Sequence, residues 1–258
     1  MSKIFLSKSD FLALIFLFLI TLGMIFLGFW QLDRANERRS ILEKIDIANN
    51  LNTIILSEYT PYEQLNPWRN AKATGRWLLN KSILIENRNY KGIPGYWLGT
   101  PLLIDEKYSI FVLRGWFPRT IPDKTESFLP TNNLDVEITI KGKIVLNVPR
   151  LFELPFNKSK EESKSFVSEK NKIFPILQNF EIKDYSEFLG MPFLPVILQQ
   201  TSEDKDLLIR DWNLPSTNFH KNIGYAIQWF SLAFVSFIFF IIFMKKIKDT
   251  RYKSFFPK

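Results

Sequence analysis

The sequence predicts a membrane protein in which two transmembrane helices, one toward each end of the chain, flank an exported α+β domain dominated by an antiparallel β-sheet. Three observations support this prediction. Twenty uncharged, mostly apolar residues run from Phe11 to Trp30, and twenty more run from Tyr225 to Met244. Between them, from Ala71 onward, short runs rich in β-branched and aromatic residues alternate with Gly, Pro and Asn.

Each apolar block is long enough, as a helix, to cross a hydrocarbon core of ~30 Å. We predict transmembrane helices at residues 11–32 and 223–244, an N-terminal tail at 1–10, an exported domain at 33–222 and a basic tail at 245–258. A cleaved signal peptide is the alternative for the first block. Twenty apolar residues exceed a usual signal core, however, and no small-x-small cleavage site follows. We therefore expect the first helix to remain in the chain.

The net charge of +8 is concentrated at the ends of the chain. Residues 245–258 carry +5 and residues 1–10 carry +1, which leaves +2 for residues 33–222. This distribution favours membrane lipid, and not nucleic acid, as the partner of the basic residues. By the positive-inside rule, the basic tail places both termini in the cytoplasm. Arg34, Arg38 and Arg39 oppose this orientation, but the C-terminal cluster is denser.

The location that we expect is a bacterial plasma membrane, with the central domain in the periplasm. The first ten residues contain only Lys3 and Lys8 as basic residues, so an Arg-rich mitochondrial presequence is missing. The chain has no cysteine, which excludes disulfides, thiol catalysis and a Cys-x-x-Cys-His haem attachment.

The first helix is expected to continue to about Asn50, because apolar residues fall on one face from Ile41 to Ala48. A hairpin is expected at Asp105-Glu106-Lys107, and a short helix from about Lys183 to Leu189, closed by Gly190. Residues 157–172 are rich in Lys, Glu and Ser, which is typical of a solvated or disordered insert. Strands are predicted at 73–79, 82–87, 97–104, 109–116, 136–146, 194–200 and 207–212.

Aromatic residues mark where the two spans meet the exported domain. Trp30 ends the first span, and Tyr225 and Trp229 open the second, as expected for an interfacial belt. Gly23 and Gly28 either let a neighbouring helix approach closely or are simply tolerated in a lipid-facing helix. The sequence leaves both interpretations open.

Four motifs in order resemble the Surfeit-locus family of cytochrome c oxidase assembly factors. The sequences are Leu27-Gly28-Phe29-Trp30-Gln31-Leu32-Asp33-Arg34, Gly95-Tyr96 with Thr100-Pro101-Leu102, Arg114-Gly115-Trp116-Phe117-Pro118, and Gly224-Tyr225-Ala226-Ile227-Gln228-Trp229-Phe230. The resemblance implies two terminal spans around an exported domain. It also implies a role in maturing the haem–copper oxidase, with oxidase subunits as partners and haem a delivery to the large subunit as the activity.

The resemblance departs at one position. The family pattern has a histidine three residues before the tyrosine that opens the second span, whereas this chain has Asn222 there and its only histidine at His220. If the helix has already begun, two residues rotate a side chain by about 200°, onto the opposite face. If the residues before Ile223 form a loop, His220 reaches the family position.

The candidate site residues are His220 as the axial iron ligand, Tyr225 and Trp229 as an aromatic wall, and Arg34, or Lys221, toward the haem propionates. The alternative is that His220 merely flanks the span. Arg114 and Trp116 are interpreted either as a partner-facing tip or as a cation–π pair within the domain.

An enzyme is not expected, because one histidine excludes His-Glu-x-x-His and no Gly-x-Ser-x-Gly or Walker sequence occurs. The alternative function is a membrane-anchored scaffold that holds oxidase subunits without binding haem.

Overall fold

The structure, a computed structural model, describes residues 8–119, 136–150, 166, 174–212, 214–215 and 217–255, without the side chains of residues 8 and 249–255. It divides into two compact units. One unit contains Met1–Lys44 and Leu214–Lys258, and therefore most of helix α1 (Lys8–Asn50) and all of helix α3 (His220–Phe255). The other unit, Ile45–Asn213, contains the β-sheet.

Both long helices are of a length and composition that could cross a membrane, and the predicted spans 11–32 and 223–244 lie inside them. Only 11% of the most apolar window of α1 and 6% of that of α3 are buried, and their exposed side chains are largely Phe, Leu and Ile. A helix that exposes apolar residues all round is unfavourable in water and suited to lipid. As expected, α1 continues to Asn50, and Ile45 and Ala48 on its predicted apolar face are buried.

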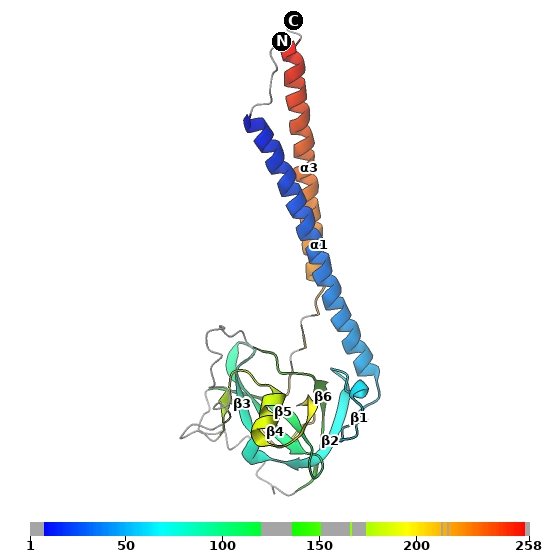
Figure 1. Cartoon of the computed structure of the whole chain (residues 1–258), viewed down its shortest axis with the longest axis vertical. Coiled ribbons are helices and arrows are strands. Elements are labelled where there is room, and N and C mark those ends of the chain that lie inside the picture. Colours follow the sequence, from blue (N-terminus) through cyan, green and yellow to red (C-terminus); the bar gives the residue numbers. More distant parts are fainter. Residues whose placement is uncertain are drawn as a thin grey trace. The chain divides into compact units, whose positions relative to one another are not determined.

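The two helices pack side by side in opposite directions (Figure 1). Thr21 of α1 donates a hydrogen bond to Ser236 of α3 at 2.9 Å, and farther along α1 the Gln31 side chain contacts Asn222. Because rising numbers in α1 meet falling numbers in α3, the pair is antiparallel. Buried positions recur every seven residues, at Thr21, Gly28 and Ala35 in α1 and at Ala226 and Ala233 in α3. This spacing is typical of a left-handed helix pair.

Gly28 permits a close approach between these helices. A Cβ atom placed on Gly28 would lie 2.6 Å from the Phe230 ring, whereas one placed on Gly23 would meet nothing within 4 Å. Phe230 also packs edge-on against Phe29, with ring centroids 5.3 Å apart. The close-packing interpretation is therefore confirmed for Gly28, and Gly23 corresponds to the alternative of a small residue in an open face.

Gly28→Ala is expected to weaken the pairing of α1 and α3 by roughly 1–3 kcal/mol, because the added methyl group must displace the Phe230 ring. Gly23→Ala is the matched control. The chain has no cysteine, so a Thr21→Cys/Ser236→Cys pair reports the pairing through its disulfide yield in membranes. Equal yields in the two alanine variants would contradict this account of Gly28.

The second unit is built on an eight-stranded sheet with the order β1-β2-β6-β8-β5-β4-β3-β7. Short helices η1 (Tyr62–Gln64), η2 (Leu79–Lys81) and α2 (Ile182–Leu189) accompany it. The strands are β1 (Ile54–Ile55), β2 (Asn70–Trp77), β3 (Ile83–Tyr90), β4 (Ile93–Leu103), β5 (Ser109–Pro118), β6 (Ile138–Val145), β7 (Ile176–Leu177) and β8 (Phe193–Gln200).

Five of these strands close into a barrel, because β2 pairs with both β6 and β4. The edge of β4 that faces away from β5 is shared: its first part pairs with β3, and Leu102 and Leu103 pair with the end of β2. A Cβ atom on Gly75 would lie 2.1 Å from the carbonyl oxygen of Leu103, so the closure requires glycine there. The predicted antiparallel sheet is confirmed for most pairs, whereas β1–β2, β3–β7 and β5–β8 are parallel.

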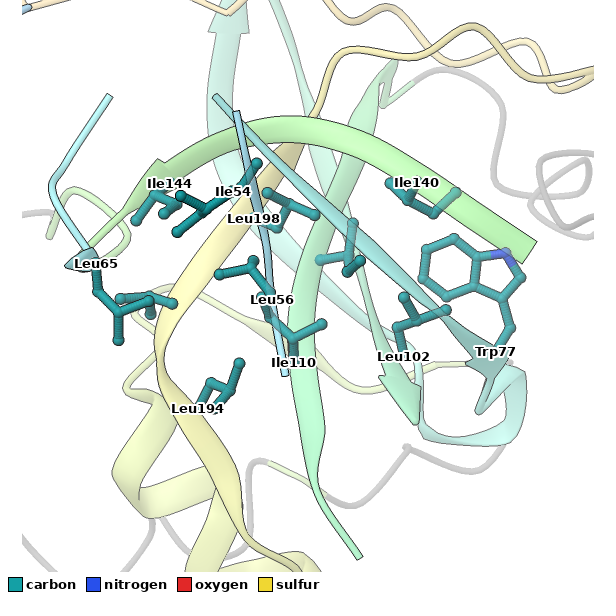
Figure 2. Packing of buried hydrophobic residues seen from close by; sticks show 14 residues of the cluster. Ile54, Leu56, Leu65, Trp77, Leu102, Ile110, Ile140, Ile144, Leu194 and Leu198 are labelled. Carbon is teal, nitrogen blue, oxygen red and sulfur yellow. The ribbon is translucent and has the colours of Figure 1, made fainter. Parts of the chain in front are cut away.

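The barrel encloses one apolar core. Figure 2 shows side chains from β2, β4, β5, β6 and β8 meeting inside the ring of strands. A second cluster covers the opposite side of the sheet, where Phe111 stacks on Phe180 at 4.2 Å and Tyr185 of α2 packs edge-on against Phe111. The Tyr185 hydroxyl donates a hydrogen bond to the carbonyl oxygen of Lys81, and burial raises the pKa of Tyr185. The expected glycine stop after α2 is confirmed, because Gly190 has φ of 63°.

The prediction of a strand at residues 207–212 is wrong. Only Ile209 pairs, by an isolated bridge to Trp116, because the neighbouring Asp206 and Arg210 direct their side chains into a buried ion cluster. Strands β1 and β7 were not predicted from the sequence, because each has only two residues. The predicted insert at 157–172 lies outside the described residues except Phe166, whose ring stacks on Phe188 at 5.1 Å.

Candidate functional site

The predicted site residues lie at the start of α3 and along the adjoining part of α1. His220 is the first residue of α3 and is exposed. Its ring lies against that of Phe219 in a tilted arrangement with centroids 4.1 Å apart, and the guanidinium of Arg39 lies 4.8 Å from the centre of the Phe219 ring. Arg38 donates a hydrogen bond to the carbonyl oxygen of Asn218 at 3.2 Å. Two arginines of α1 therefore hold the residues that lead into α3.

Asn222 occupies the helix–helix seam, in contrast to His220. Its side-chain Nδ2 donates to Gln31 Oε1 at 2.7 Å, and its Oδ1 is buried with no partner among the described residues. Because α3 already includes both positions, the His220 imidazole points about 200° away from the direction of Asn222. Of the two backbone possibilities left open by the sequence, the structure has the helix and not the loop.

The other predicted residues are not gathered around His220. Arg34 is exposed and pairs with Glu37 of its own helix at 2.7 Å. Tyr225 is exposed and Trp229 is half-buried; four residues apart, they share one side of α3. Within the described residues, no recorded hydrogen bond, ion pair or ring contact joins His220 to any of these three.

Three contacts at this junction were missed by sequence reasoning: Gln31 with Asn222, Arg38 with Asn218, and Arg39 with Phe219. The seven-residue spacing of Gln31 and Arg38 on α1 was a usable signal, because it places both on the face toward α3. In the described part of the chain, no three His, Asp or Glu side chains form a group suited to a metal ion. His220 supplies the only imidazole in the sequence.

Comparison with known proteins places these features in a family. The sequence profile described as the SURF1 family matches residues 18–234. The chain belongs to the SURF1 family. Similar proteins, each named "SURF1-like protein", come from Rickettsia felis (26% identical, covering 87% of this chain and 93% of the relative), Rickettsia conorii (26%; 93% and 92%) and Rickettsia prowazekii (29%; 84% and 83%).

One of the four sequence motifs that indicated the family has a structural role in the barrel unit. This motif is Arg114-Gly115-Trp116-Phe117-Pro118. The side chain of Arg114 is fully buried, at 0% exposure, and its Nη2 lies 3.0 Å from Asp206 Oδ2. Its guanidinium also lies over the Trp77 ring at 4.9 Å. The partner-facing interpretation is therefore wrong. The predicted cation–π pair of Arg114 with Trp116 is also wrong, because the ring that Arg114 lies over is Trp77.

Charges around Arg114 offset the cost of its burial. Burial lowers the pKa of the guanidinium, and the carboxylates of Asp206 and Asp204 act in the opposite direction. Asp206, at 2% exposure, also binds Arg210 at 2.5 Å, whereas Asp204 is 29% exposed and 3.7 Å from Arg114. Asp206 is thus the carboxylate that the cluster depends on.

Two glycines of the family motifs leave space for their neighbours: Gly115 for the segment that carries Asp206, and Gly95 for the Trp116 ring. A Cβ atom on Gly115 would lie 2.6 Å from Leu208 Cβ, and one on Gly95 would lie 2.5 Å from the Trp116 ring. The backbones of Trp116 and Ile209 exchange two hydrogen bonds of 2.8 Å, and Trp116 Nε1 donates to the carbonyl oxygen of Arg88. Residues 206–209 are therefore fastened across β5.

Asp206→Asn is expected to destabilise the barrel by about 3–5 kcal/mol, because it leaves the buried charges of Arg114 and Arg210 without their shared carboxylate. Asp204→Asn, the matched control, removes a longer and partly solvated contact and should cost about 0–1 kcal/mol. Urea unfolding followed by tryptophan fluorescence measures both. Similar losses in the two variants would show that Asp206 is not the principal partner of Arg114.

Proposed function

We propose that the chain is a membrane-anchored assembly factor for haem–copper cytochrome c oxidase that acts beside the oxidase subunits in a bacterial plasma membrane. The observation that carries this proposal is the SURF1 family match through residues 18–234, which spans the barrel and reaches into both apolar helices. The lipid-suited surfaces of α1 and α3 support the membrane location. No catalytic role is proposed.

The activity that we propose is help in delivering haem a, as cargo, to the large oxidase subunit. Histidine is a common axial ligand of haem iron, and a flat ring such as Phe219 favours stacking with a macrocycle. His220 is exposed, so haem could reach it from outside the helix pair. A single exchangeable ligand suits a protein that must release its cargo. Arg34 would have to leave Glu37 to meet a propionate.

A scaffold that holds oxidase subunits without haem is the second candidate, and Asn222 favours it. At the position of the family histidine this chain has an amide, and that amide is hydrogen-bonded to Gln31 of the neighbouring helix at 2.7 Å. The Asn222 amide therefore joins the two helices by a hydrogen bond, and it provides no imidazole that could bind iron. The two candidates differ in whether His220 or the helix seam is essential.

Under the delivery hypothesis, His220→Ala should remove or strongly shift any Soret absorption of protein purified from a haem a-producing host. Insertion into the membrane should persist, because His220 lies outside the apolar block. Asn222→His in the His220→Ala background should restore the haem spectrum, since it returns an imidazole to the family position.

Under the scaffold hypothesis the same variants give a different pattern. Oxidase yield survives His220→Ala, and it falls with Trp229→Ala or Arg34→Ala, which disturb the helix seam and the interface. If His220→Ala changes neither haem content nor oxidase yield, His220 is a flanking residue and delivery through it is excluded.

The membrane orientation that we propose has both termini in the cytoplasm and the barrel in the periplasm. A reporter that is active only outside the cytoplasm should be active when inserted within residues 157–172 and inactive when fused after Lys258. The reason is the basic tail, in which each Lys or Arg contributes about 1 kcal/mol near an anionic surface. The reverse pattern of activity would overturn the orientation.

A further inference from the structure

Two lysines lie directly opposite each other on the outer face of the barrel. In the antiparallel pairing of β2 with β6, Lys72 is in register with Lys141. The next pair on the same face, Thr74 and Thr139, has its hydroxyl groups 2.8 Å apart. The intervening residues Ala73 and Ile140 are buried in the barrel core, so the lysines point away from it.

Further cations extend this row. Lys143 precedes the pair along the ladder and Arg76 follows it; with Lys72 and Lys141 they form what we term the basic stripe. Lys143 Nζ donates to Asn49 Oδ1 at 3.0 Å. Among the described residues, no carboxylate lies within ion-pair distance of the four cations. Acidic residues near these strands include Asp46 in α1, Glu58 after β1, Glu203 and Asp204 after β8, and Glu137, which lies one residue beyond the last β2–β6 pair, Gly75 with Ile138.

The lysine pair costs the fold stability. Like charges directly opposite in an antiparallel ladder repel, and a Lys–Glu pair in the same register would attract. Nothing in the surrounding described residues offsets the repulsion between Lys72 and Lys141, because neither has an ion-pair partner there. Because the Lys72–Lys141 pair lowers the stability of the fold, we look for its role in binding a partner.

The backbone of this face has no free edge to offer a partner. Strand β2 is paired with β1, β6 and β4, and β6 is paired with β2 and β8. A partner therefore cannot add a strand here and must contact the side chains. Those side chains are four cations with two threonines between them and Ile55, 73% exposed, opposite Lys72 on β1.

We propose that the basic stripe is the docking surface for an acidic segment of an oxidase subunit. The proposal rests on the assembly function proposed above and names the surface that serves it. Carboxylates of the partner would lie between Lys72 and Lys141 and remove the repulsion between them. The free energy that this repulsion costs the folded protein would then be recovered on binding. A protein partner is favoured over lipid because insertion into a bilayer needs several apolar side chains beside the cations, and the ladder has threonines there.

The test uses charge reversal in the full-length chain, with co-purified oxidase subunit and oxidase yield as readouts. Lys72→Glu should lower the co-purified subunit about tenfold, since it reverses the field at the centre of the stripe. It should also raise the thermal unfolding temperature, because the introduced carboxylate would pair with Lys141. Lys72→Glu combined with Lys141→Glu keeps a like-charge pair, so its stability should match the parent while binding is lost.

Lys107→Glu, on the exposed hairpin between β4 and β5, is the control for a general loss of positive charge. A photoreactive residue at Thr74 should crosslink the full-length protein to an oxidase subunit in membranes, and the crosslink should disappear in the double variant. Crosslinks to lipid alone would overturn the proposal, and so would full oxidase yield in both Lys72 variants. If deletion of the whole chain leaves oxidase yield unchanged, the proposed assembly function is wrong. If deletion lowers oxidase yield but the basic-stripe variants do not, only the proposed docking surface is wrong.

Discussion

The buried ion pair of Arg114 with Asp206 is the interaction on which the barrel unit depends most. Burial of a guanidinium is costly unless a carboxylate pairs with it; here Asp206 provides the carboxylate, and Trp77 adds an aromatic face. Asp206 belongs to the segment that crosses β5, so the pair fixes that segment as well as filling the end of the core. The small residues Gly95 and Gly115 then follow as requirements, because larger side chains would obstruct Trp116 and Leu208.

A different set of interactions holds helices α1 and α3 together. Within lipid, apolar surface gives little reason for two helices to associate, so close packing and polar contacts have to do it. Gly28 provides the close packing with Phe230, and the Thr21–Ser236 and Gln31–Asn222 hydrogen bonds provide the polar contacts. The motif Leu-Gly-x-Trp-Gln at the end of the first apolar block thus includes two residues of the seam itself.

Periodicity predicted most of the fold, because long apolar blocks and alternating strands are written in local sequence. It predicted α1 as far as Asn50, α2, and six of the longer strands, with boundaries that moved by a few residues. It could not reveal the barrel closure, which depends on one edge of β4 being shared by β3 and β2. It misassigned residues 207–212 because Asp206, which directs this segment into the buried ion cluster, pairs with Arg114, a residue distant in sequence. For the candidate site, the sequence found His220 and the departure at Asn222, but the direction of each side chain depends on where α3 begins.

The Gln31–Asn222 contact gives this helix junction a chemical property that an imidazole would not. A histidine gains a proton between about pH 8 and 5, so a helix seam that contained one would change its charge as the pH falls through that range. Neither amide ionises, and the hydrogen bond between them is the same in either condition. The Gln31–Asn222 contact between α1 and α3 therefore keeps the same charge and the same hydrogen bond across the pH range in which a histidine at position 222 would titrate.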